Sequence, residues 1–296
     1  MFIKIDRNTK LYLIYVFVIS YILEAAIILE NLRKENIIAD MLMLILIFIP
    51  AAMAGIMVNI LNEMPHFLRI KIRNSKFLIP AYVYPATIVV LAAALLSILG
   101  INIDWSLTEY KIKLYWIAIR MGIPPSELYK LVLTITLLAP IAYALLALGE
   151  EIGWRGYLLD KLLIENSLER TILFIGAIWA LWHAPLIIFT GYNYKNLKAL
   201  GLLLFIPFCI AHGAILTWLR IKTGSVLAPA LGHGAINAFV FLSEVLYPGA
   251  SDYMHLMLGI PGVIIASVFG FLAYKDLARD LLTLREFEFI TESLES

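Results

Sequence analysis

Long apolar runs dominate the chain, and short polar segments separate them. A helix needs roughly 20 mainly apolar residues to cross a bilayer core about 30 Å thick, because it rises about 1.5 Å per residue. Runs of that length cover 11–30, 40–61, 79–100, 131–149, 171–190, 199–219, 225–246 and 255–274. The pattern predicts an all-α, polytopic membrane protein with about eight transmembrane helices. We treat residues 1–296 as a single membrane domain.

Composition supports this prediction and excludes one class of partner. Of the 296 residues, 62% are hydrophobic and 15% are charged, whereas soluble domains have about 45–50% apolar and about 25% charged residues. The formal net charge is only +1, so no basic surplus indicates binding to nucleic acid. Membrane lipid is therefore the first expected partner.

The positions of Lys and Arg predict the orientation of the spans. About two thirds of the 23 Lys and Arg residues lie on one side of the expected membrane, where such residues mark the cytoplasm. That side comprises the N-terminus, 62–78, 150–170, 220–224 and the C-terminal tail. We therefore expect a cell-membrane protein with cytoplasmic N- and C-termini. The first run is too long for the apolar part of a signal peptide, so we expect it to be retained as a helix.

The segment 101–130 is not apolar enough to cross the membrane and not polar enough for a plain loop. Its Trp, Tyr and Lys residues are typical of a helix that lies at the membrane surface. A Pro-Pro pair follows, and Ser126 and Glu127 then open the next expected helix.

Two adjacent carboxylates, Glu150 and Glu151, directly follow the fourth apolar run in the sequence ALLALGEEIGWRGYLL. An ionised side chain at the edge of hydrocarbon loses hydration, so it is retained where it is paired, hydrated or used. Arg155 is four residues after Glu151, which places these two side chains on one helical face as an ion pair. Glu150, about 100° away around the helix, is left to face another group. The alternative is a charged helix end at the membrane surface.

Three more polar side chains lie in the apolar runs of the second half. His183 stands in IWALWHAPLII, one turn after Trp179, and His233 and Asn237 share a helical face in LGHGAINAF. Each has a structural alternative, namely a hydrogen bond to a neighbouring helix. The small residues around His233 would let a substrate or another backbone approach closely.

Together these residues form the inventory of a hydrolytic site. Amide hydrolysis needs a general base for water, which Glu150 and His183 can supply, and donors for the oxyanion, which His233 and Asn237 can supply. A zinc ion held by Glu150, His183 and His233 is an alternative, although the H-E-x-x-H pattern is missing. No G-x-S-x-G pattern occurs, and Ser225 is more typical of a helix cap.

The remaining polar residues in the apolar runs receive structural interpretations. We expect His212 to make a structural hydrogen bond, Cys209 to be a small buried apolar side chain, and Glu24 and Glu244 to be interfacial or paired with another helix. We expect Arg220 and Lys222 to extend their charged ends toward the cytoplasmic face.

Three sequence motifs resemble those of the CPBP family of intramembrane proteases, also called Abi, which includes the type II CAAX prenyl endopeptidases. They are GEEIGWRGYLL, IWALWHAPLI and KTGSVLAPALGHGAINAF, all within 140–240. The first contains E-E-x-x-x-R and the third H-x-x-x-N. The second motif usually has Phe four residues before its His, and here Trp179 takes that place.

The resemblance implies an eight-helix fold around a polar catalytic cavity that is open to the cytoplasm. It implies that Glu150 and His183 activate water and that His233 and Asn237 hold the oxyanion. Glu151 and Arg155 would support the site, and Trp179 would shape the cavity wall. In this family a glutamate mechanism without bound metal is favoured, so we expect no cofactor, with zinc as the alternative.

The leading hypothesis is therefore an intramembrane endopeptidase, a hydrolase that cuts a peptide bond near the C-terminus of a membrane-associated substrate. Prenylated CAAX-type proteins are the substrate class that the resemblance suggests. Two alternatives from other classes are a proton-coupled transporter and a non-catalytic scaffold that binds lipidated proteins. A transporter would place polar residues on corresponding helices of two repeated halves, and the first half offers little beyond Glu24.

Overall fold

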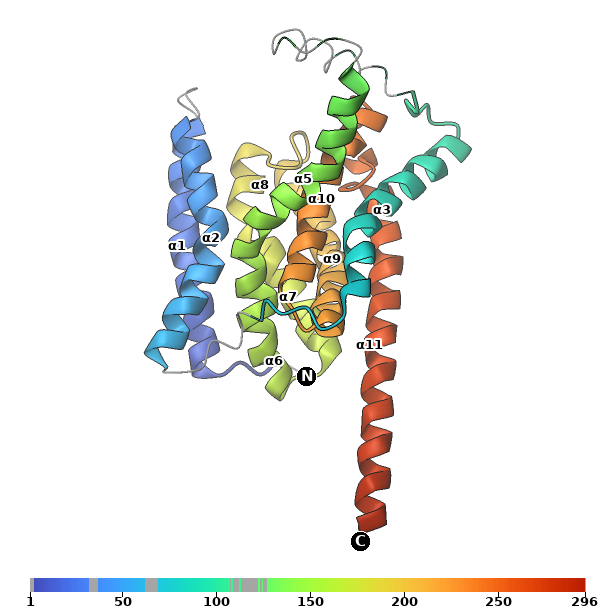
Figure 1. The fold of residues 1–296 in the computed structure, drawn as a ribbon. Helices are drawn as coiled ribbons and strands as arrows, with labels where there is room; N and C mark the ends of the chain where they lie inside the picture. Colours follow the sequence, from blue (N-terminus) through green and yellow to red (C-terminus); the bar gives the residue numbers. More distant parts are fainter. Residues whose placement is uncertain are drawn as a thin grey trace.

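We describe the protein from a computed structural model, which covers residues 3–31, 37–61, 69–106, 108, 112, 122, 124 and 127–295. All regular structure in these residues is helical (Figure 1). The helices long and apolar enough to cross a membrane number eight in the described part: Arg7–Glu30, Ile37–Ile60, Ser75–Ile98, Thr136–Glu165, Leu168–Thr190, Lys198–Thr223, Leu227–Leu246 and Ile260–Thr283. The prediction of an all-α, polytopic membrane protein is confirmed. The expected surface helix in 101–130 falls largely outside the described residues.

The individual elements follow the chain in a simple order. They are α1 (Arg7–Asn31), α2 (Ile37–Ile60), the 3₁₀ turn η2 (Ser75–Phe77), α3 (Leu78–Ile98), α5 (Leu128–Glu151), the π-helix η4 (Ile152–Leu158), α6 (Leu159–Glu165), α7 (Leu168–Trp182), α8 (Ala184–Thr190), η5 (Lys198–Gly201), α9 (Leu202–Thr223), α10 (Leu227–Leu246), η6 (Asp252–Met254) and α11 (Ile260–Glu295).

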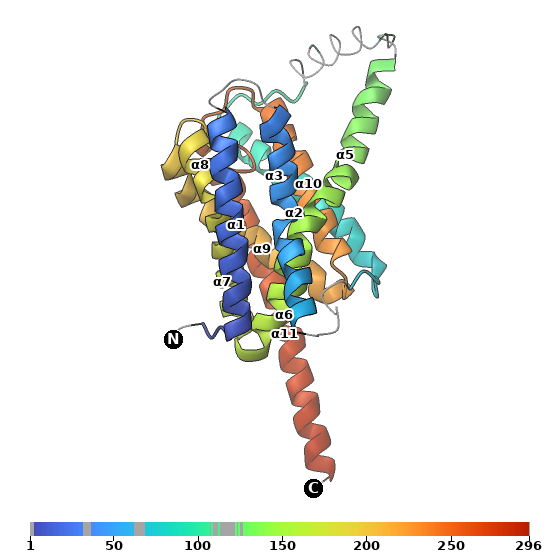
Figure 2. The ribbon, with the colours of Figure 1, turned by 90° about the vertical axis from the view of Figure 1, so that its left-hand side faces the viewer.

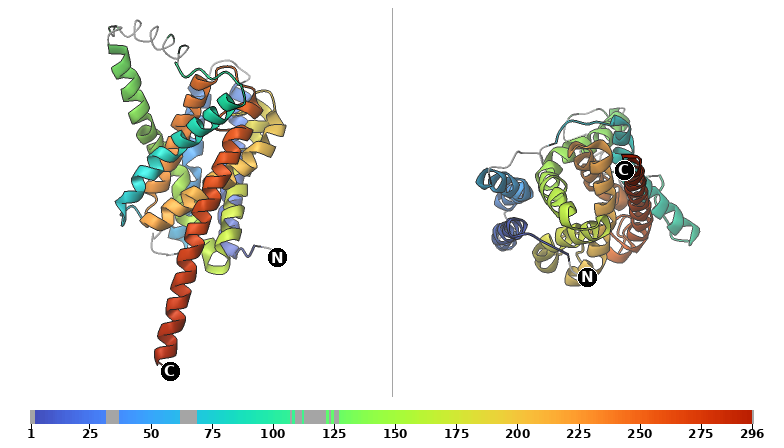
Figure 3. Two further views of the ribbon diagram at one scale, coloured as in Figure 1. Left: turned by 90° about the vertical axis from the view of Figure 1, so that its right-hand side faces the viewer. Right: turned by 90° about the horizontal axis from the view of Figure 1, so that it is seen from below.

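The helices α5, α7, α9 and α10 form the centre of the bundle. Helix α5 packs against α10, and α7 packs against α9. Helices α1 and α2 pair on one flank, whereas α3 and α11 lie on the other, as the views in Figures 2 and 3 show. The polar residues of all three sequence motifs therefore lie on or directly next to central helices, which are packed on several sides.

Glycine residues allow the closest helix crossings in this centre. A Cβ atom on Gly176 of α7 would lie 2.6 Å from Cα of Ile210 in α9, and one on Gly234 of α10 would lie 2.3 Å from the backbone nitrogen of Ala144 in α5. Helices in membranes associate by such close approach, because lipid chains are as apolar as the side chains they contact. These crossings fix the helices that carry the polar residues.

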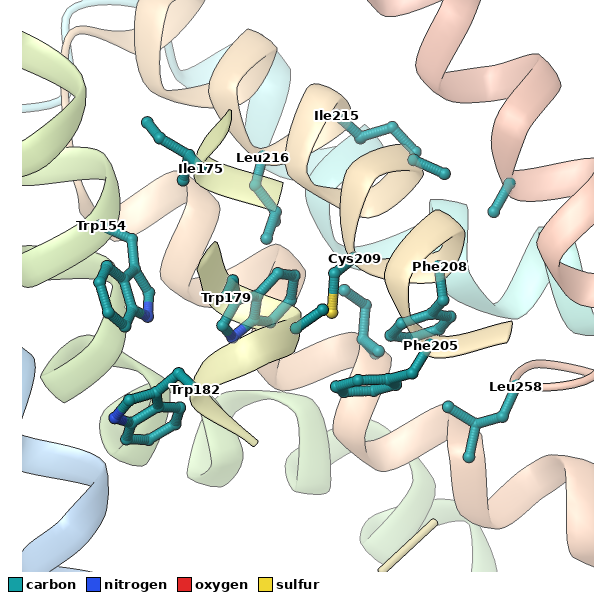
Figure 4. Close-up of a cluster of buried hydrophobic side chains, with 14 of the residues drawn as sticks. Trp154, Ile175, Trp179, Trp182, Phe205, Phe208, Cys209, Ile215, Leu216 and Leu258 are labelled. Atoms are coloured by element: carbon teal, nitrogen blue, oxygen red, sulfur yellow. The ribbon is translucent and has the colours of Figure 1, made fainter. Parts of the chain in front are cut away.

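Aromatic side chains fill the core between these helices (Figure 4). The rings of Trp154 and Trp182 meet edge to face with centroids 6.0 Å apart, and those of Phe205 and Phe208 stack at 5.5 Å. The Trp182 indole N–H donates to Oγ of Ser20 in α1 at 2.7 Å. Large rigid rings bury much surface with little loss of conformational freedom, so they hold the surrounding backbone in place.

The fourth span differs from its prediction in a way that moves the two glutamates. The sequence predicts that it ends at residue 149 and that 150–170 forms a loop, but the helix continues through η4 and α6 to Glu165. The chain turns only at Asn166 and Ser167, where the Ser167 side chain accepts from the Arg170 N–H at the start of α7. Glu150 and Glu151 therefore lie halfway along a span and not at its edge.

Candidate active site

Polar residues from each of the three motifs line one cavity of about 270 Å³ inside the bundle. Glu150 comes from α5, Trp179 from α7, and His233 and Asn237 from α10. His183 lies in the turn between α7 and α8. The apolar part of the lining includes Ala147, Phe205, Phe208, Ile236 and Val240. The structure thus gathers in one place the catalytic candidates that the sequence spreads over nearly 90 positions.

The second glutamate forms the predicted ion pair and binds a histidine as well. Oε1 of Glu151 accepts from Nη1 of Arg155 at 2.9 Å and lies 2.8 Å from Nδ1 of His233. Glu151 and Arg155 are fully buried. One carboxylate oxygen therefore joins the first motif to the third, and it fixes the ring of His233 from behind the cavity.

A π-helix follows directly after Glu151. π-helical turns are rare in proteins overall, but those that occur are often found at functional sites. Gly153 in η4 lies against α2, where an added Cβ would be 2.4 Å from Cβ of Pro50. The spacing of Glu151 and Arg155 predicts their ion pair, but nothing in the sequence analysis predicts the π-helix in which Arg155 lies.

The first glutamate has a different partner. The indole N–H of Trp179 donates to Oε2 of Glu150 at 2.7 Å, within a residue that is 6% exposed. The described residues supply no hydrogen bond to its Oε1, and Glu150 lines the cavity. The two adjacent carboxylates are therefore distinct: Glu151 is tied into an ion pair, and Glu150 keeps one oxygen for a group in the cavity.

The hydrogen bonds of the two histidines define their tautomers. Nδ1 of His183 lies 3.0 Å from the backbone oxygen of Trp179, and a carbonyl can only accept, so Nδ1 carries the proton and neutral His183 keeps Nε2 as an acceptor. The carboxylate of Glu151 likewise places a proton on Nδ1 of His233. His233 donates through Nε2 only when its ring is doubly protonated. The pair can thus accept a proton at His183 and donate one at His233.

Sequence reasoning missed three polar residues of the cavity, namely Tyr143, Tyr192 and Asn193. The ring of Tyr192 lies nearly parallel to that of His183, with centroids 6.2 Å apart. Burial, together with the negative charge of Glu150, raises the pKa of Tyr192 to about 12. Its hydroxyl is therefore a neutral donor beside the site. Tyr192 and Asn193 are in a connecting segment, where no periodicity marks a residue as inward-facing.

That connecting segment is fixed to another one. Asp252 accepts from the backbone N–H groups of Asn196 and Leu197 at 2.7 and 2.8 Å, and the Tyr194 hydroxyl donates to the backbone oxygen of Leu258 at 3.0 Å. Leu258 itself lines the cavity. Segments 191–197 and 247–259 therefore cover one end of the cavity together.

The cavity lies in the half of the bundle that is far from the chain termini. Its lining residues belong to the first half of the span Thr136–Glu165 and the second half of Leu168–Thr190, which run in opposite directions. At the other end, the backbone of Lys4 and the side chain of Asn166 exchange two hydrogen bonds of 2.8 Å. The cavity therefore lies nearer to the membrane face opposite the termini.

The geometry does not favour the zinc alternative. Among the residues that the structure describes, no three His, Cys, Asp or Glu side chains are grouped as ligands of a metal ion. Zinc requires four ligands at about 2.0–2.3 Å, and catalytic sites usually supply three from the protein. The hydrogen bonds to Oε2 of Glu150 and from Nδ1 of His183 and His233 leave Oε1 and the two Nε2 atoms as the atoms that a zinc ion would use, and these side chains are not grouped as a ligand set. We therefore derive no step through a metal.

The residues given structural interpretations lie outside the cavity lining. His212 is buried with Nδ1 3.4 Å from the Tyr84 hydroxyl, and Cys209 is buried and free. Ser225 differs from its prediction, because the N-cap of α10 is Val226; Ser225 Oγ accepts from the Leu227 N–H and donates to the backbone oxygen of Ile70. Glu24 differs from its prediction, because it is fully buried in α1 and neither carboxylate oxygen has a hydrogen-bond partner within the described part of the chain.

Comparison with known proteins agrees with the resemblance of the motifs. Residues 128–239 match the family described as type II CAAX prenyl endopeptidase Rce1-like. The chain is 35% identical to CAAX prenyl protease 2 of Methanococcus maripaludis over 105 residues. This matched stretch covers 33% of the chain. The match spans 38% of that relative's length. The resemblance to CAAX-type intramembrane proteases is therefore confirmed for the region that contains the cavity-lining motifs.

Proposed function

We propose that this chain, similar to Rce1-like endopeptidases over residues 128–239, is an intramembrane endopeptidase. It hydrolyses a peptide bond near the C-terminus of a membrane-associated substrate, and prenylated CAAX-type proteins are the proposed class. The observation that carries this proposal is the convergence of Glu150, His183, His233 and Asn237 on one cavity within the membrane-spanning bundle. The hydrolysis needs only water as a second reactant.

The proposed reaction assigns each of these residues one task. Glu150 takes a proton from a water molecule through its free Oε1, with His183 Nε2 as a second acceptor beside it. The water oxygen attacks the peptide carbonyl carbon, and the resulting oxyanion accepts hydrogen bonds from His233 and Asn237. The C–N bond then breaks as the proton held by Glu150 passes to the leaving amine. The carboxylate is restored, and atoms and charges balance.

An apolar groove next to the cavity supports the proposal that the substrate carries a lipid. It lies between α2 and α5 and is lined only by apolar side chains, among them Leu44, Ile45, Phe48 and Leu145. Leu146 belongs to this groove and to the cavity, so the two adjoin. A farnesyl or geranylgeranyl chain in the groove would bury its methylene groups at about 0.8 kcal/mol each. The attached peptide would then enter the cavity beside Glu150.

Cleavage of matched peptides tests the proposal. The detergent-purified protein should cut a fluorogenic CAAX peptide whose cysteine is farnesylated at least about tenfold faster than the same peptide with a free thiol, because the groove holds the lipid. The measurement is kcat/KM for the two peptides. Equal rates would remove the prenyl requirement, and failure to cut any prenylated peptide would overturn the proposed function.

A chelator arm separates water activation by glutamate from zinc chemistry. We expect the purified protein to keep its activity after exhaustive dialysis against a chelator, with metal content measured on the same sample. Loss of activity that stoichiometric zinc restores would instead support a zinc site on Glu150, His183 and His233. Activity lost without rescue by any metal would point to unfolding, which a melting curve of the dialysed protein reveals.

Two arguments about the orientation of the protein in the membrane disagree: the distribution of positive charge and the side from which the substrate arrives. The distribution of Lys and Arg favours cytoplasmic termini, whereas a prenylated CAAX protein reaches the membrane from the cytoplasm. We infer that the substrate requirement prevails, because the charge excess is moderate and the covering segments 191–197 and 247–259 carry few charges. The covered end of the cavity then faces the cytoplasm.

Cysteine labelling measures this orientation directly. The single Cys209 is buried, so a new cysteine reports alone. In intact cells a membrane-impermeant maleimide should label Thr283→Cys, on the side of the termini, and should leave Tyr253→Cys unlabelled until the cells are lysed. Tyr253 is 51% exposed. The reverse pattern would support the charge rule and argue against a cytoplasmic substrate.

A further inference from the structure

Trp179 contacts Glu150, His183 and His233, three of the four residues that the proposed mechanism uses. Its indole N–H donates to Oε2 of Glu150 at 2.7 Å, and its backbone oxygen accepts from Nδ1 of His183 at 3.0 Å. Its ring meets that of His233 edge to face at 5.0 Å, and the Arg155 guanidinium lies 4.7 Å from the ring centroid. One side chain therefore lies against four charged or titratable groups.

The contact with Glu150 differs in kind from the others. A phenylalanine of similar outline, which the second motif usually has at this position, would fill the same wall and keep the backbone oxygen for His183. It would supply no donor to the carboxylate. Trp179 is 2% exposed, so water has little access to replace that donor. The indole N–H thus gives the cavity wall of this chain a hydrogen-bond donor that a phenylalanine at this position would lack.

We propose that Trp179 is a positioning residue that aims the carboxylate of Glu150, and this proposal rests on the proposed function. Its N–H engages Oε2 and holds the carboxylate plane, so that Oε1 points at the water in the cavity. A hydrogen bond to one oxygen also restricts rotation of the carboxylate. Trp179 forms part of the cavity wall, and its N–H acts on the reaction through Glu150.

The test removes the N–H and keeps the ring. Incorporation of 3-benzothienylalanine at position 179 replaces the N–H by sulfur within an isosteric ring. Hydrogen bonds to charged groups contribute enough that kcat should fall by roughly 10–100-fold. KM should change less than about twofold, because uniform substrate binding does not involve Glu150 orientation. Trp179→Phe should lower kcat similarly if it folds.

A matched control comes from the same helix. The Trp182 N–H also makes a buried 2.7 Å hydrogen bond, to Ser20 and away from the cavity. The same isostere at position 182 should lower the melting temperature without lowering kcat. Equal kcat for the protein carrying the isostere at 179 and the unmodified protein, or an effect on KM alone, would overturn the positioning role.

The two proposals fail in distinguishable ways. If Glu150→Gln is inactive and the isostere at 179 is fully active, only the role of Trp179 is lost. If Glu150→Gln cuts the farnesylated peptide at the normal rate, the proposed mechanism is lost whatever position 179 does. Melting curves recorded for each variant show whether a lower kcat reflects chemistry or unfolding.

Discussion

Glu150→Gln abolishes hydrolysis and leaves the bundle folded: this is the largest effect we expect from a single substitution. Glutamine matches glutamate in shape, and its amide oxygen can still accept from Trp179. It cannot take a proton from water. Removal of a general base lowers rates by typically 10²–10⁴-fold, so we expect kcat on the farnesylated peptide to fall at least about 10³-fold. Stopped assays with a long incubation set the measured limit.

A second glutamate in the membrane provides the control for this substitution. Glu24 is fully buried in α1 and lies outside the cavity lining. Glu24→Gln makes the same chemical change in a comparable apolar setting. It should keep kcat and KM within about twofold, with no loss in melting temperature, because it removes an unpaired buried carboxyl. Residual activity of Glu150→Gln above a few per cent would contradict the role of Glu150 as base.

Arg155→Met is the substitution with the largest expected effect on stability. It leaves the fully buried carboxylate of Glu151 with His233 as its remaining partner. Breaking a buried pair by removing one member costs about 3–5 kcal/mol, because the other charge stays without compensation. The free energy of unfolding, measured by denaturant titration in detergent micelles, should fall by that amount. Activity should fall as well, since Glu151 orients His233.

The double variant Glu151→Gln/Arg155→Met separates loss of charge balance from loss of packing. Without either charge the buried penalty disappears, so the double variant should regain about half of the stability lost in Arg155→Met. As a surface comparison, Arg279 pairs with Asp276 but its side chain is 75% exposed. Arg279→Met should change the free energy of unfolding by less than about 1 kcal/mol. If Arg155→Met and Arg279→Met lowered the free energy of unfolding by similar amounts, burial of the Glu151–Arg155 pair would have no special effect.

The parts of the fold that depend on local composition were predictable from the sequence. Each span contains its own apolar run, so the number of spans and most of their bounds could be read directly. The spacing of Glu151 and Arg155 predicted their ion pair for the same reason. The hydrogen bond from His233 to Glu151 was not predictable, because it joins residues 82 positions apart and depends on how α5 and α10 cross at Gly234.

Two features escaped prediction for physical reasons. The charged letters GEEIGWR suggested a membrane edge, because charged residues in isolation belong in water. In the structure these residues satisfy one another within the bundle, and the apolar residues of α6 continue the span beyond them. Tyr192 escaped because its direction is set by contacts of segment 191–197 with Asp252 and Leu258, and these contacts carry no periodic pattern.

The π-helix after Glu151 sets the rotational phase between the two halves of this span. A π turn accommodates one residue more than an α turn. A single deletion within Ile152–Leu158 that converted η4 to an ordinary α-helix would therefore leave the flanking helices nearly in phase. A deletion between Leu159 and Leu162 has no such reserve, because each residue of an α-helix turns the chain by about 100°. It would rotate Leu162, which is buried on α6, relative to Glu150, so the cavity and the α6 contacts would no longer be in register.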